Sequence, residues 1–539
     1  MIPLRFHFAL SISATSMLLL FLSAQACAAA DDRPNIVLIM ADDLGFSDLG
    51  CYGGEINTPH LDRLAQDGLR FSQFYNNAIC TMTRASLLTG LYARRDDLKK
   101  FGDRPTIADV LRAAGYRTLM TGKWHLPGRP TERGFDRYAG LLSGCCNHFN
   151  PGAKRPGEAG PPGKKFAGDN QPFFVDGKVV RPYTPDANFY STDRFTDDAL
   201  EFLDESGDDD RPFFLYVAYT VPHYPLHAPP EDIARYRGKY LAGWDQLRQA
   251  RYERLKELGL IEKNWPLSPR SPHAPAWNDV EDKPAWDLKM AVYAAMVDRM
   301  DQNIGRILAK IRQRGEDQNT LILFLSDNGA SDEDRTSTPN VPPGPVESYR
   351  SVDLPWATLS NTPFQHFKRW NHEGGIATPL IAYWPKIITE GGRITDDVGH
   401  VIDIMATCID IGAAQHPRSY KGREVSAPHG RSLLPVLKGE ERQGETALFW
   451  NQRGLWRAVR QGQWKLVSPD HTIQYNPWRP DRKGRVVHQP PRDPDTLWEL
   501  YDIKADRGEL LNLADQHPER VRQMADMYRR WEMRCEALP

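Results

Sequence analysis

Several features of common protein classes are missing from this chain of 539 residues. Its seven cysteines are irregularly spaced, with no CxxC motif and no Cys/His cluster, which argues against a disulfide scaffold and a structural zinc site. Lys and Arg (68) nearly balance Asp and Glu (70), so nucleic-acid binding is not expected as the main role. There is no internal repeat. The remaining picture is a large globular protein, long enough for more than one domain.

The longest apolar run lies at the start of the chain. Residues 1–30 combine a short basic segment, an apolar stretch from Phe8 to Leu22 and small residues suited to cleavage, which is the pattern of a secretory signal peptide. We therefore expect a periplasmic or secreted protein, with no stable membrane insertion once the signal is removed. Lipid attachment through Cys27 is the lesser alternative, because Ala24 stands where such a signal normally has leucine.

The rest of the chain alternates between apolar strands and amphipathic helices. Continuous apolar runs at 35–40, 213–219 and 320–326 are typical of strands buried on both faces, and residues 286–314 have the spacing of a long helix. This alternation predicts an α/β fold with a large, mostly parallel sheet between helices. After about residue 430 the pattern changes to short strands and a final helix. We predict a main domain over 31–430 and a smaller C-terminal α+β subdomain over 431–539.

Acidic and amide side chains follow two of the predicted strands. Asp42 and Asp43 come directly after the first strand, and Asp327 and Asn328 follow the strand at 320–326. Ligands of parallel sheets bind beyond the carboxyl ends of the strands, and adjacent carboxylates repel unless a cation or protons relieve them. Either pair alone is explained by turn chemistry. Together they predict an oxygen-ligand site for Ca²⁺, with Mg²⁺ as the other candidate.

A cysteine stands where a helix is predicted to begin. This helix extends from Cys80 towards Gly90 and carries Arg84 one turn after the cysteine. A nucleophile at a helix N-terminus faces unpaired N–H groups and the positive end of the helix dipole, which favours an anionic substrate. Buried cysteines and surface arginines are common in helices, so the surrounding motifs decide the interpretation.

Four further side chains complete the candidate set: Lys123, His125, His223 and Lys368. Each alone is more simply explained as a solvated charge or a structural histidine. Lys123 and His125 are two residues apart after a strand, and in extended backbone their side chains point the same way. Beside a metal ion and Cys80, the set suits a tetrahedral oxyanion ester.

Two long segments, 151–185 and 331–362, are rich in proline, glycine and polar residues. Loops of this length are usually functional or disordered, and we interpret both as walls of a substrate site, with mobile surface loops as the alternative. Aromatic residues in or near these segments would either stack on a substrate or pack locally; they are Tyr183, Tyr190, Tyr349 and Trp356.

Five motifs together resemble the type I sulfatases of the alkaline phosphatase superfamily, and especially the bacterial arylsulfatases. The matching segments are 35–45, 80–90, 121–126, 326–329 and 372–376, in the order found in that family. The resemblance extends from about Arg33 to the C-terminus. It implies an alkaline phosphatase-like fold and hydrolysis of a sulfate monoester, either an aryl sulfate or a sulfated carbohydrate, to an alcohol and inorganic sulfate.

The resemblance also implies roles for the site residues. Cys80 would be oxidised to formylglycine by a separate maturation enzyme, and its hydrated form would attack sulfur, with Arg84 holding that group in place. One Ca²⁺ would be bound by Asp42, Asp43, Asp327, Asn328 and residue 80. The remaining catalytic residues would bind the sulfate oxygens or handle protons; they are Lys123, His125, His223 and Lys368.

One position departs from the family pattern. The maturation motif of the family is Cys-x-Pro-x-Arg, sometimes with alanine for proline, whereas the middle residue here is Met82. Methionine differs from proline in backbone restriction and volume. The first hypothesis is a maturation enzyme that accepts methionine. The alternatives are a phosphate or phosphonate ester hydrolase that uses unconverted Cys80 or Thr81 as nucleophile, and a non-catalytic sulfoglycan-binding protein.

Overall fold

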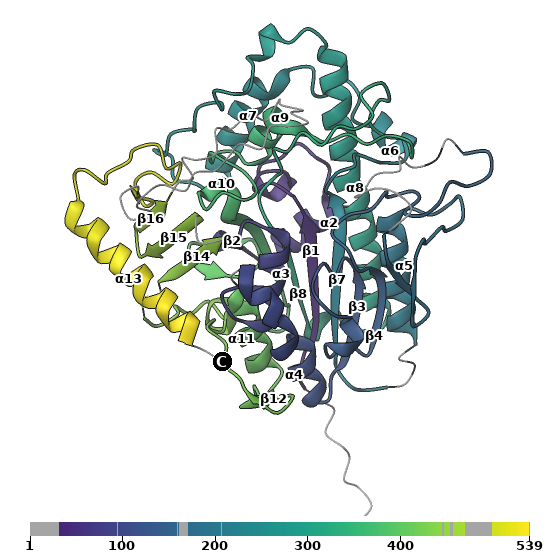
Figure 1. Ribbon diagram of the computed structural model, residues 1–539, viewed down its shortest axis with the longest axis vertical. Coiled ribbons are helices and arrows are strands. Elements are labelled where there is room, and N and C mark those ends of the chain that lie inside the picture. The colour runs from purple at the N-terminus through teal and green to yellow at the C-terminus, as the bar shows by residue number, and fades with distance from the viewer. Residues whose placement is uncertain are drawn as a thin grey trace, which may run out of the picture.

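The computed structural model of the chain describes residues 32–537 except 94, 159, 161–170, 206, 208, 445–446, 453–455 and 469–497. The predicted signal peptide and Cys27 lie outside the described residues. A large mixed sheet occupies the centre, helices cover both of its faces, and a smaller antiparallel sheet lies beside it (Figure 1). The predicted α/β class with a smaller antiparallel region near the C-terminus is confirmed.

Within the described part of the chain, the large sheet contains eleven strands. They are β1 (Asn35–Asp42), β2 (Leu69–Tyr75), β3 (Arg117–Gly122), β4 (Arg137–Leu141), β5 (Phe173–Val175), β6 (Lys178–Val180), β7 (Phe213–Pro222), β8 (Thr320–Ser326), β9 (Ala377–Tyr383), β10 (Arg393–Thr395) and β11 (Gly399–His400). Their order is β10-β2-β9-β8-β1-β7-β3-β4-β5-β6, with β11 paired to β2. β1 runs parallel to both β7 and β8, so the three predicted apolar runs form the centre of the sheet. β9 is antiparallel to both of its neighbours.

Helices form a layer on each face of the large sheet. They are α2 (Pro59–Asp67), α3 (Cys80–Thr89), α4 (Ile107–Ala113), α5 (Ser191–Asp204), α6 (Pro230–Ala234), α7 (Gly243–Glu257), α8 (Lys283–Gln313), α9 (Asp353–Ser360), α10 (Glu373–Ile376), α11 (Ile402–Ile411), α12 (Leu434–Leu437) and α13 (Pro518–Ala537). Short 3₁₀ helices are η1 (Gly50–Tyr52), η2 (Arg95–Asp103), η3 (Pro130–Glu132), η4 (Trp277–Asp279) and η5 (Asp317–Asn319). One layer contains α2, α5 and α8, and the other contains α3, α4 and α11. No described helix is both long and apolar enough to cross a membrane.

The smaller sheet is formed by strands near the C-terminus. Its strands are β14 (Leu448–Gln452), β15 (Trp456–Gln461), β16 (Trp464–Ser468) and β17 (Glu499–Asp502), all antiparallel, and a separate hairpin pairs β12 (Ser419–Tyr420) with β13 (Arg423–Glu424). α13 lies along one face of this sheet, where Tyr528 and Met524 pack against Val459 and Leu466 (Figure 1). The boundary between residues 430 and 431 stays a prediction.

One sequence interpretation needs correction at this level. Residues 353–360, inside the second long segment, form the buried helix α9. Trp356 on this helix is fully buried and packs edge-on against Trp244 with ring centroids 5.1 Å apart. Tyr190 is also buried, and its hydroxyl donates to the carbonyl of His227 at 2.9 Å. Both aromatic side chains therefore pack in the interior and are not available to stack on a substrate.

Candidate active site

The ends of β1 and β8 bring the predicted acidic and amide residues together. Asp42 is the last residue of β1, and Asp327 and Asn328 directly follow β8, its parallel neighbour. Asp43 has a left-handed backbone with φ of 67°, which turns the chain sharply after the strand. The Asn328 Nδ2 donates to Asp43 Oδ1 at 2.6 Å. All four side chains are buried, so the sheet has gathered them at one edge, as the strand-end rule predicts.

This group of oxygen atoms fits a divalent cation. Among the described residues, Asp42 Oδ1 and Asn328 Oδ1 are buried without a hydrogen-bond partner, which is costly for polar atoms. Ligand atoms of Asp42, Asp43 and His223 all lie within 4.8 Å of one another. Burial raises the pKa of Asp42, and burial together with Asp42 raises the pKa of Asp327 to about 6. A cation bound by these hard oxygen donors would offset the repulsion between them.

Each of the three carboxylates also meets a cationic side chain. Lys123 Nζ lies 2.6 Å from Asp42 Oδ2, and Lys368 Nζ lies 2.7 Å from Asp43 Oδ1. The charges of these side chains therefore balance. A divalent cation added to them would leave a positive site for an anionic group.

The third pair joins a helix to the sheet. Arg84 donates from Nη2 to Asp327 Oδ2 at 2.8 Å and from Nη1 to the carbonyl of Lys123 at 2.9 Å. These bonds fix α3 against the ends of β8 and β3. Arg84 thereby positions Asp327 and the backbone at Lys123.

Cys80 is the first residue of α3, as predicted, and is 6% exposed. The loop before it is held by side chains: the Asn77 N–H donates to Thr83 Oγ1 at 2.9 Å, and the Ala78 N–H donates to Asn76 Oδ1 at 2.9 Å. The Cys80 Sγ lies 3.3 Å from His125 Nδ1. Burial raises the pKa of the thiol even though two lysines are near. Residue 80 thus sits at a helix N-terminus beside a titratable base.

The two histidines reach the site by different routes. His125 has a φ of 55°, so its backbone is not extended. The prediction that extended backbone would point the side chains of Lys123 and His125 the same way was therefore wrong in its premise. The sharp turn nevertheless directs its ring to Cys80. His223 Nδ1 donates to the carbonyl of Tyr224 at 2.6 Å, which leaves Nε2 facing Asp43 Oδ2 at 3.6 Å. Burial lowers the pKa of His223 to about 4 and, with nearby cations, lowers that of His125 well below its usual value.

Some residues beside the site were missed by the sequence interpretation. Glu333 accepts a hydrogen bond from the Tyr224 hydroxyl at 2.9 Å and forms ion pairs with Arg335 and Arg369. Arg369 directly follows Lys368 in the sequence, and this adjacency was the one sequence feature that could have indicated Arg369. Glu333 and Arg335 belong to the second long segment, which composition predicted to be a substrate wall without indicating either of these two residues.

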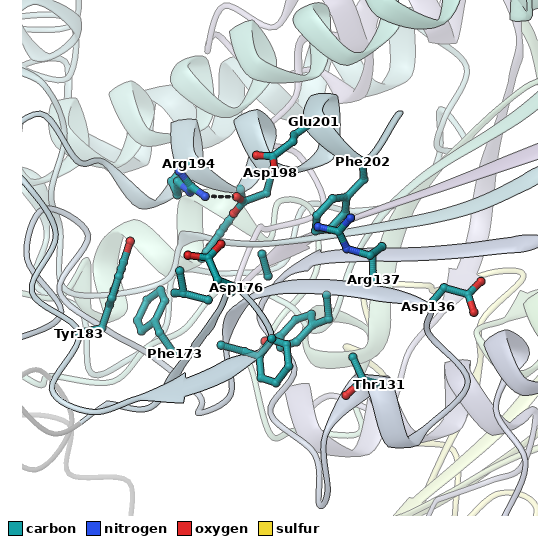
Figure 2. Close-up of a pocket in the computed structure, with 17 residues that line it drawn as sticks. Thr131, Asp136, Arg137, Phe173, Asp176, Tyr183, Arg194, Asp198, Glu201 and Phe202 are labelled. Carbon is teal, nitrogen blue, oxygen red and sulfur yellow. Dashed lines mark ion pairs between the residues drawn. The ribbon is translucent and has the colours of Figure 1, made fainter. Parts of the chain in front are cut away.

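A cavity of about 300 Å³ lies elsewhere, between α5 and strands β4 and β5 near one end of the sheet. Figure 2 shows Arg194 paired with Asp198 at this cavity, together with Phe173 and Tyr183. None of the candidate catalytic or metal-binding residues lines it. Residues 173–177 and Tyr183 of the first long segment therefore line this cavity and not the candidate active site.

Comparison with known proteins identifies the family. The family model described as Sulfatase matches residues 34–412. This chain belongs to the sulfatase family. The sulfatase is 33% identical to an arylsulfatase of Klebsiella aerogenes over 464 residues, which cover 78% of this chain and 96% of the relative. It is 32% identical to an uncharacterized sulfatase of Schizosaccharomyces pombe, with 93% of each chain covered. The sulfatase is therefore a sulfuric ester hydrolase.

Solved structures agree with this fold. Ps i-CgsB, solved in complex with k-i-k-neocarrahexaose, superposes with a TM-score of 0.63 at 23% identity, covering 93% of the sulfatase and 92% of that chain. The two chains therefore share the same overall fold.

Proposed function

We propose that this sulfatase is a secreted, calcium-dependent enzyme that hydrolyses an aryl sulfate or a sulfated carbohydrate with formylglycine formed from Cys80. The supporting observation is the position of Cys80 at the start of α3, beside three carboxylates and three cations at one edge of the sheet. The similarity to an arylsulfatase supports an aryl sulfate as a test substrate. The oligosaccharide bound to a structural neighbour adds sulfated sugars to the panel.

Each residue of the site receives a role in this proposal. Bound Ca²⁺ would withdraw charge from the sulfate group, and formylglycine would supply the attacking oxygen. Asp42, Asp43, Asp327, Asn328 and residue 80 would hold the metal. Residue 80 would thus both bind the metal and attack the sulfate group, whereas the remaining substrate-handling residues are distinct from the ligands.

Four side chains would handle the sulfate group and protons. Lys123 and Lys368 place ammonium groups beside the carboxylates, where they would bind sulfate oxygens and stabilise charge that develops during transfer. His125, at 3.3 Å from the Cys80 Sγ, would move the proton of the group at position 80. His223, fixed through its Nδ1–H, would exchange a proton with the leaving alcohol from Nε2.

The unconverted alternative is less well supported by the site. A thiolate is the nucleophilic form of cysteine, and burial raises the pKa of Cys80, so little thiolate is present at neutral pH. Conversion requires a maturation enzyme that accepts Met82. A host with such an enzyme is therefore the source of protein for the decisive experiment.

The experiment combines mass spectrometry of residue 80 with turnover of 4-nitrophenyl sulfate and of sulfated monosaccharides. We expect formylglycine at position 80, loss of turnover in Cys80→Ala, and loss on EGTA treatment that added Ca²⁺ reverses. Undiminished turnover by protein that contains only cysteine at position 80 would reject the formylglycine assignment. Turnover that survives complete chelation would reject the metal assignment.

A further inference from the structure

Two arginines beside the site share one buried carboxylate. Arg335 Nη2 lies 2.5 Å and Arg369 Nη1 lies 3.0 Å from the same Glu333 Oε1. The side chains of Arg335 and Arg369 are 50% and 39% exposed, whereas that of Glu333 is only 9% exposed. The carboxylate therefore anchors two guanidinium groups from below, and both groups reach the solvent.

This arginine pair is connected to the residues that would bind sulfate. The hydroxyl of Tyr224 donates to Glu333 Oε2 at 2.9 Å, and the ring of Tyr224 lies 4.1 Å from that of His223, measured between centroids. Arg369 directly follows Lys368, and its backbone N–H donates to the carbonyl of Ala78 at 2.7 Å, two residues before Cys80. The pair therefore lies at the border of the reacting centre.

Further acidic residues lie close to the two guanidiniums. Asp332 is buried, with Oδ1 3.8 Å from Arg369 Nη2, so it lies beneath the guanidinium together with Glu333. Asp334 is exposed but accepts a hydrogen bond from the backbone N–H of Thr336 at 3.1 Å. The two guanidinium side chains are 50% and 39% exposed, whereas those of Glu333 and Asp332 are only 9% and 2% exposed.

Such an arrangement is poorly explained by stability. Ion pairs of half-exposed arginines contribute about 0–1 kcal/mol. A guanidinium presents several donors in a fixed fork that matches carboxylate, sulfate and phosphate oxygens, and an anchored guanidinium loses less side-chain entropy when it binds them. Two guanidinium groups that are held in place by ion pairs next to an active site are suited to bind an anion.

We propose that Arg335 and Arg369 form a subsite for a second anionic group of the substrate, a sulfate ester or a carboxylate carried next to the sulfate that is removed. This inference rests on the proposed sulfatase reaction and narrows its substrate to multiply anionic molecules, such as disulfated sugars or sulfated sugars linked to a uronate. Glu333 is a positioning residue in this subsite, because it holds both guanidiniums without reaching the substrate itself.

The test compares substrates that differ in one anionic group. A monosulfated sugar, the disulfated form of the same sugar and its uronate-linked form are assayed with wild type, Arg335→Gln and Arg369→Gln. We expect the preference in kcat/KM for the doubly anionic forms over the monosulfated sugar to fall at least tenfold in each variant, mainly through KM. The disulfated and uronate arms show which anion the subsite accepts.

A matched control is available on another face of the protein. Arg306 on α8 is 45% exposed and pairs at 2.5 Å with Asp197 on α5, and neither helix contributes a residue to the proposed subsite. Arg306→Gln should leave the preference unchanged. Equal losses on mono- and doubly anionic substrates in Arg335→Gln, or no loss at all, would overturn the subsite. Arg335→Lys should retain part of the preference, because lysine keeps the charge but not the two-pronged geometry of the guanidinium.

Failure of the proposed reaction can be separated from failure of the subsite. If wild type hydrolyses no sulfate ester, the reaction is wrong, and the subsite is judged by calorimetric binding of the mono- and disulfated sugars to Cys80→Ala protein. Tighter binding of the disulfated sugar that is lost on adding Arg335→Gln supports the subsite. Equal affinity for the two sugars contradicts it.

Discussion

At the scale of single residues, position 82 is subject to two different requirements: the maturation motif favours proline there, whereas packing in the fold uses the methionine side chain. It is the third residue of α3 and is 3% exposed. The first four N–H groups of a helix have no partner within the helix, and the first intrahelical bond here runs from the Thr83 N–H to the carbonyl of Ile79. The backbone at position 82 therefore tolerates proline, while the buried side chain contributes to packing.

The variant Met82→Pro tests this separation. With a maturation enzyme specific for Cys-x-Pro-x-Arg, the fraction of Cys80 converted to formylglycine should rise, as measured by peptide mass spectrometry. The free energy of unfolding should fall by about 1–3 kcal/mol because buried side-chain volume is lost. Thr81→Ala serves as the control at the neighbouring position. Equal conversion of wild type and Met82→Pro would show that position 82 does not limit maturation.

Asp198 on α5 provides a pH-dependent prediction. Burial raises its pKa from 3.8 to about 6, outweighing the ion pair with Arg194 (Figure 2). Between about pH 4 and 6 the folded protein therefore binds a proton that the unfolded chain releases, so stability falls as pH rises through this range.

Removing this carboxyl should flatten the pH dependence. In Asp198→Asn, the decrease in unfolding free energy from pH 4 to 6 should be smaller than in wild type by up to about 3 kcal/mol, measured by urea titration at each pH. Asp197→Asn, on the exposed side of the same helix, is the surface control. Identical slopes in wild type and Asp198→Asn would contradict the assignment.

At the scale of elements, α3 is defined by its two ends. It begins at Cys80 and stops at Gly90, whose φ is 67° and whose N–H donates to the carbonyl of Ser86 at 2.8 Å. A Cβ at Gly90 would lie 2.8 Å from the Cβ of Met405 on α11. The end of α3 is therefore fixed by backbone conformation and by contact with the next helix of its layer.

Two glycine variants separate these effects. Gly177 also has a positive φ, of 76°, but its added Cβ would meet nothing within 4 Å. Gly177→Ala should cost about 1–2 kcal/mol from backbone strain alone. Gly90→Ala should cost about 1–3 kcal/mol more because α3 and α11 must separate. Chemical denaturation of both variants measures the difference, and equal costs would exclude the steric contribution.

Sequence patterns predicted some elements well and missed others for physical reasons. Runs of apolar residues identified β1, β7 and β8 because both faces of these strands are buried. In β2 the half-buried Arg70 and Gln73 interrupt the buried residues without strict alternation, and β9 contains Pro379, so neither strand has a distinct pattern. Antiparallel pairing of β9 with β8 depends on contacts between distant residues, which periodicity does not encode.

The candidate site was predicted to a similar extent. Strand ends and helix starts were enough to gather Asp42, Asp327 and Cys80, because parallel topology fixes where they meet. Lys368 instead reaches Asp43 across 325 positions of sequence, and only the overall family resemblance implied its role. The ion pairs of Glu333 lie in a segment without periodicity, so only the folded structure shows them.

At the scale of the whole molecule, a buried ionic cluster joins the two sheets. Lys465 on β16 lies 2.8 Å from both Glu373 on α10 and Glu509, and Arg507 donates to Glu373 at 2.8 Å. These four side chains are at most 1% exposed. Removing one partner of a buried ion pair leaves an uncompensated charge and is strongly destabilising.

Lys465→Met should therefore reduce the free energy of unfolding by about 3–5 kcal/mol, measured by guanidinium denaturation. The exposed pair Arg63–Asp67, at 2.5 Å, provides the control, and Arg63→Met should cost less than about 1 kcal/mol. A small effect of Lys465→Met would show that the cluster does not hold the sheets together.

The smaller sheet also closes over the start of α3. Trp450 on β14 donates from its indole Nε1 to the carbonyl of Asn76 at 2.7 Å. A strand that is synthesised late therefore contacts the peptide just before Cys80. An enzyme that binds the segment around this cysteine in extended conformation must act before the contact between Trp450 and Asn76 forms. If the proposed conversion of Cys80 takes place, it would therefore precede the closure made by residues more than 350 positions downstream.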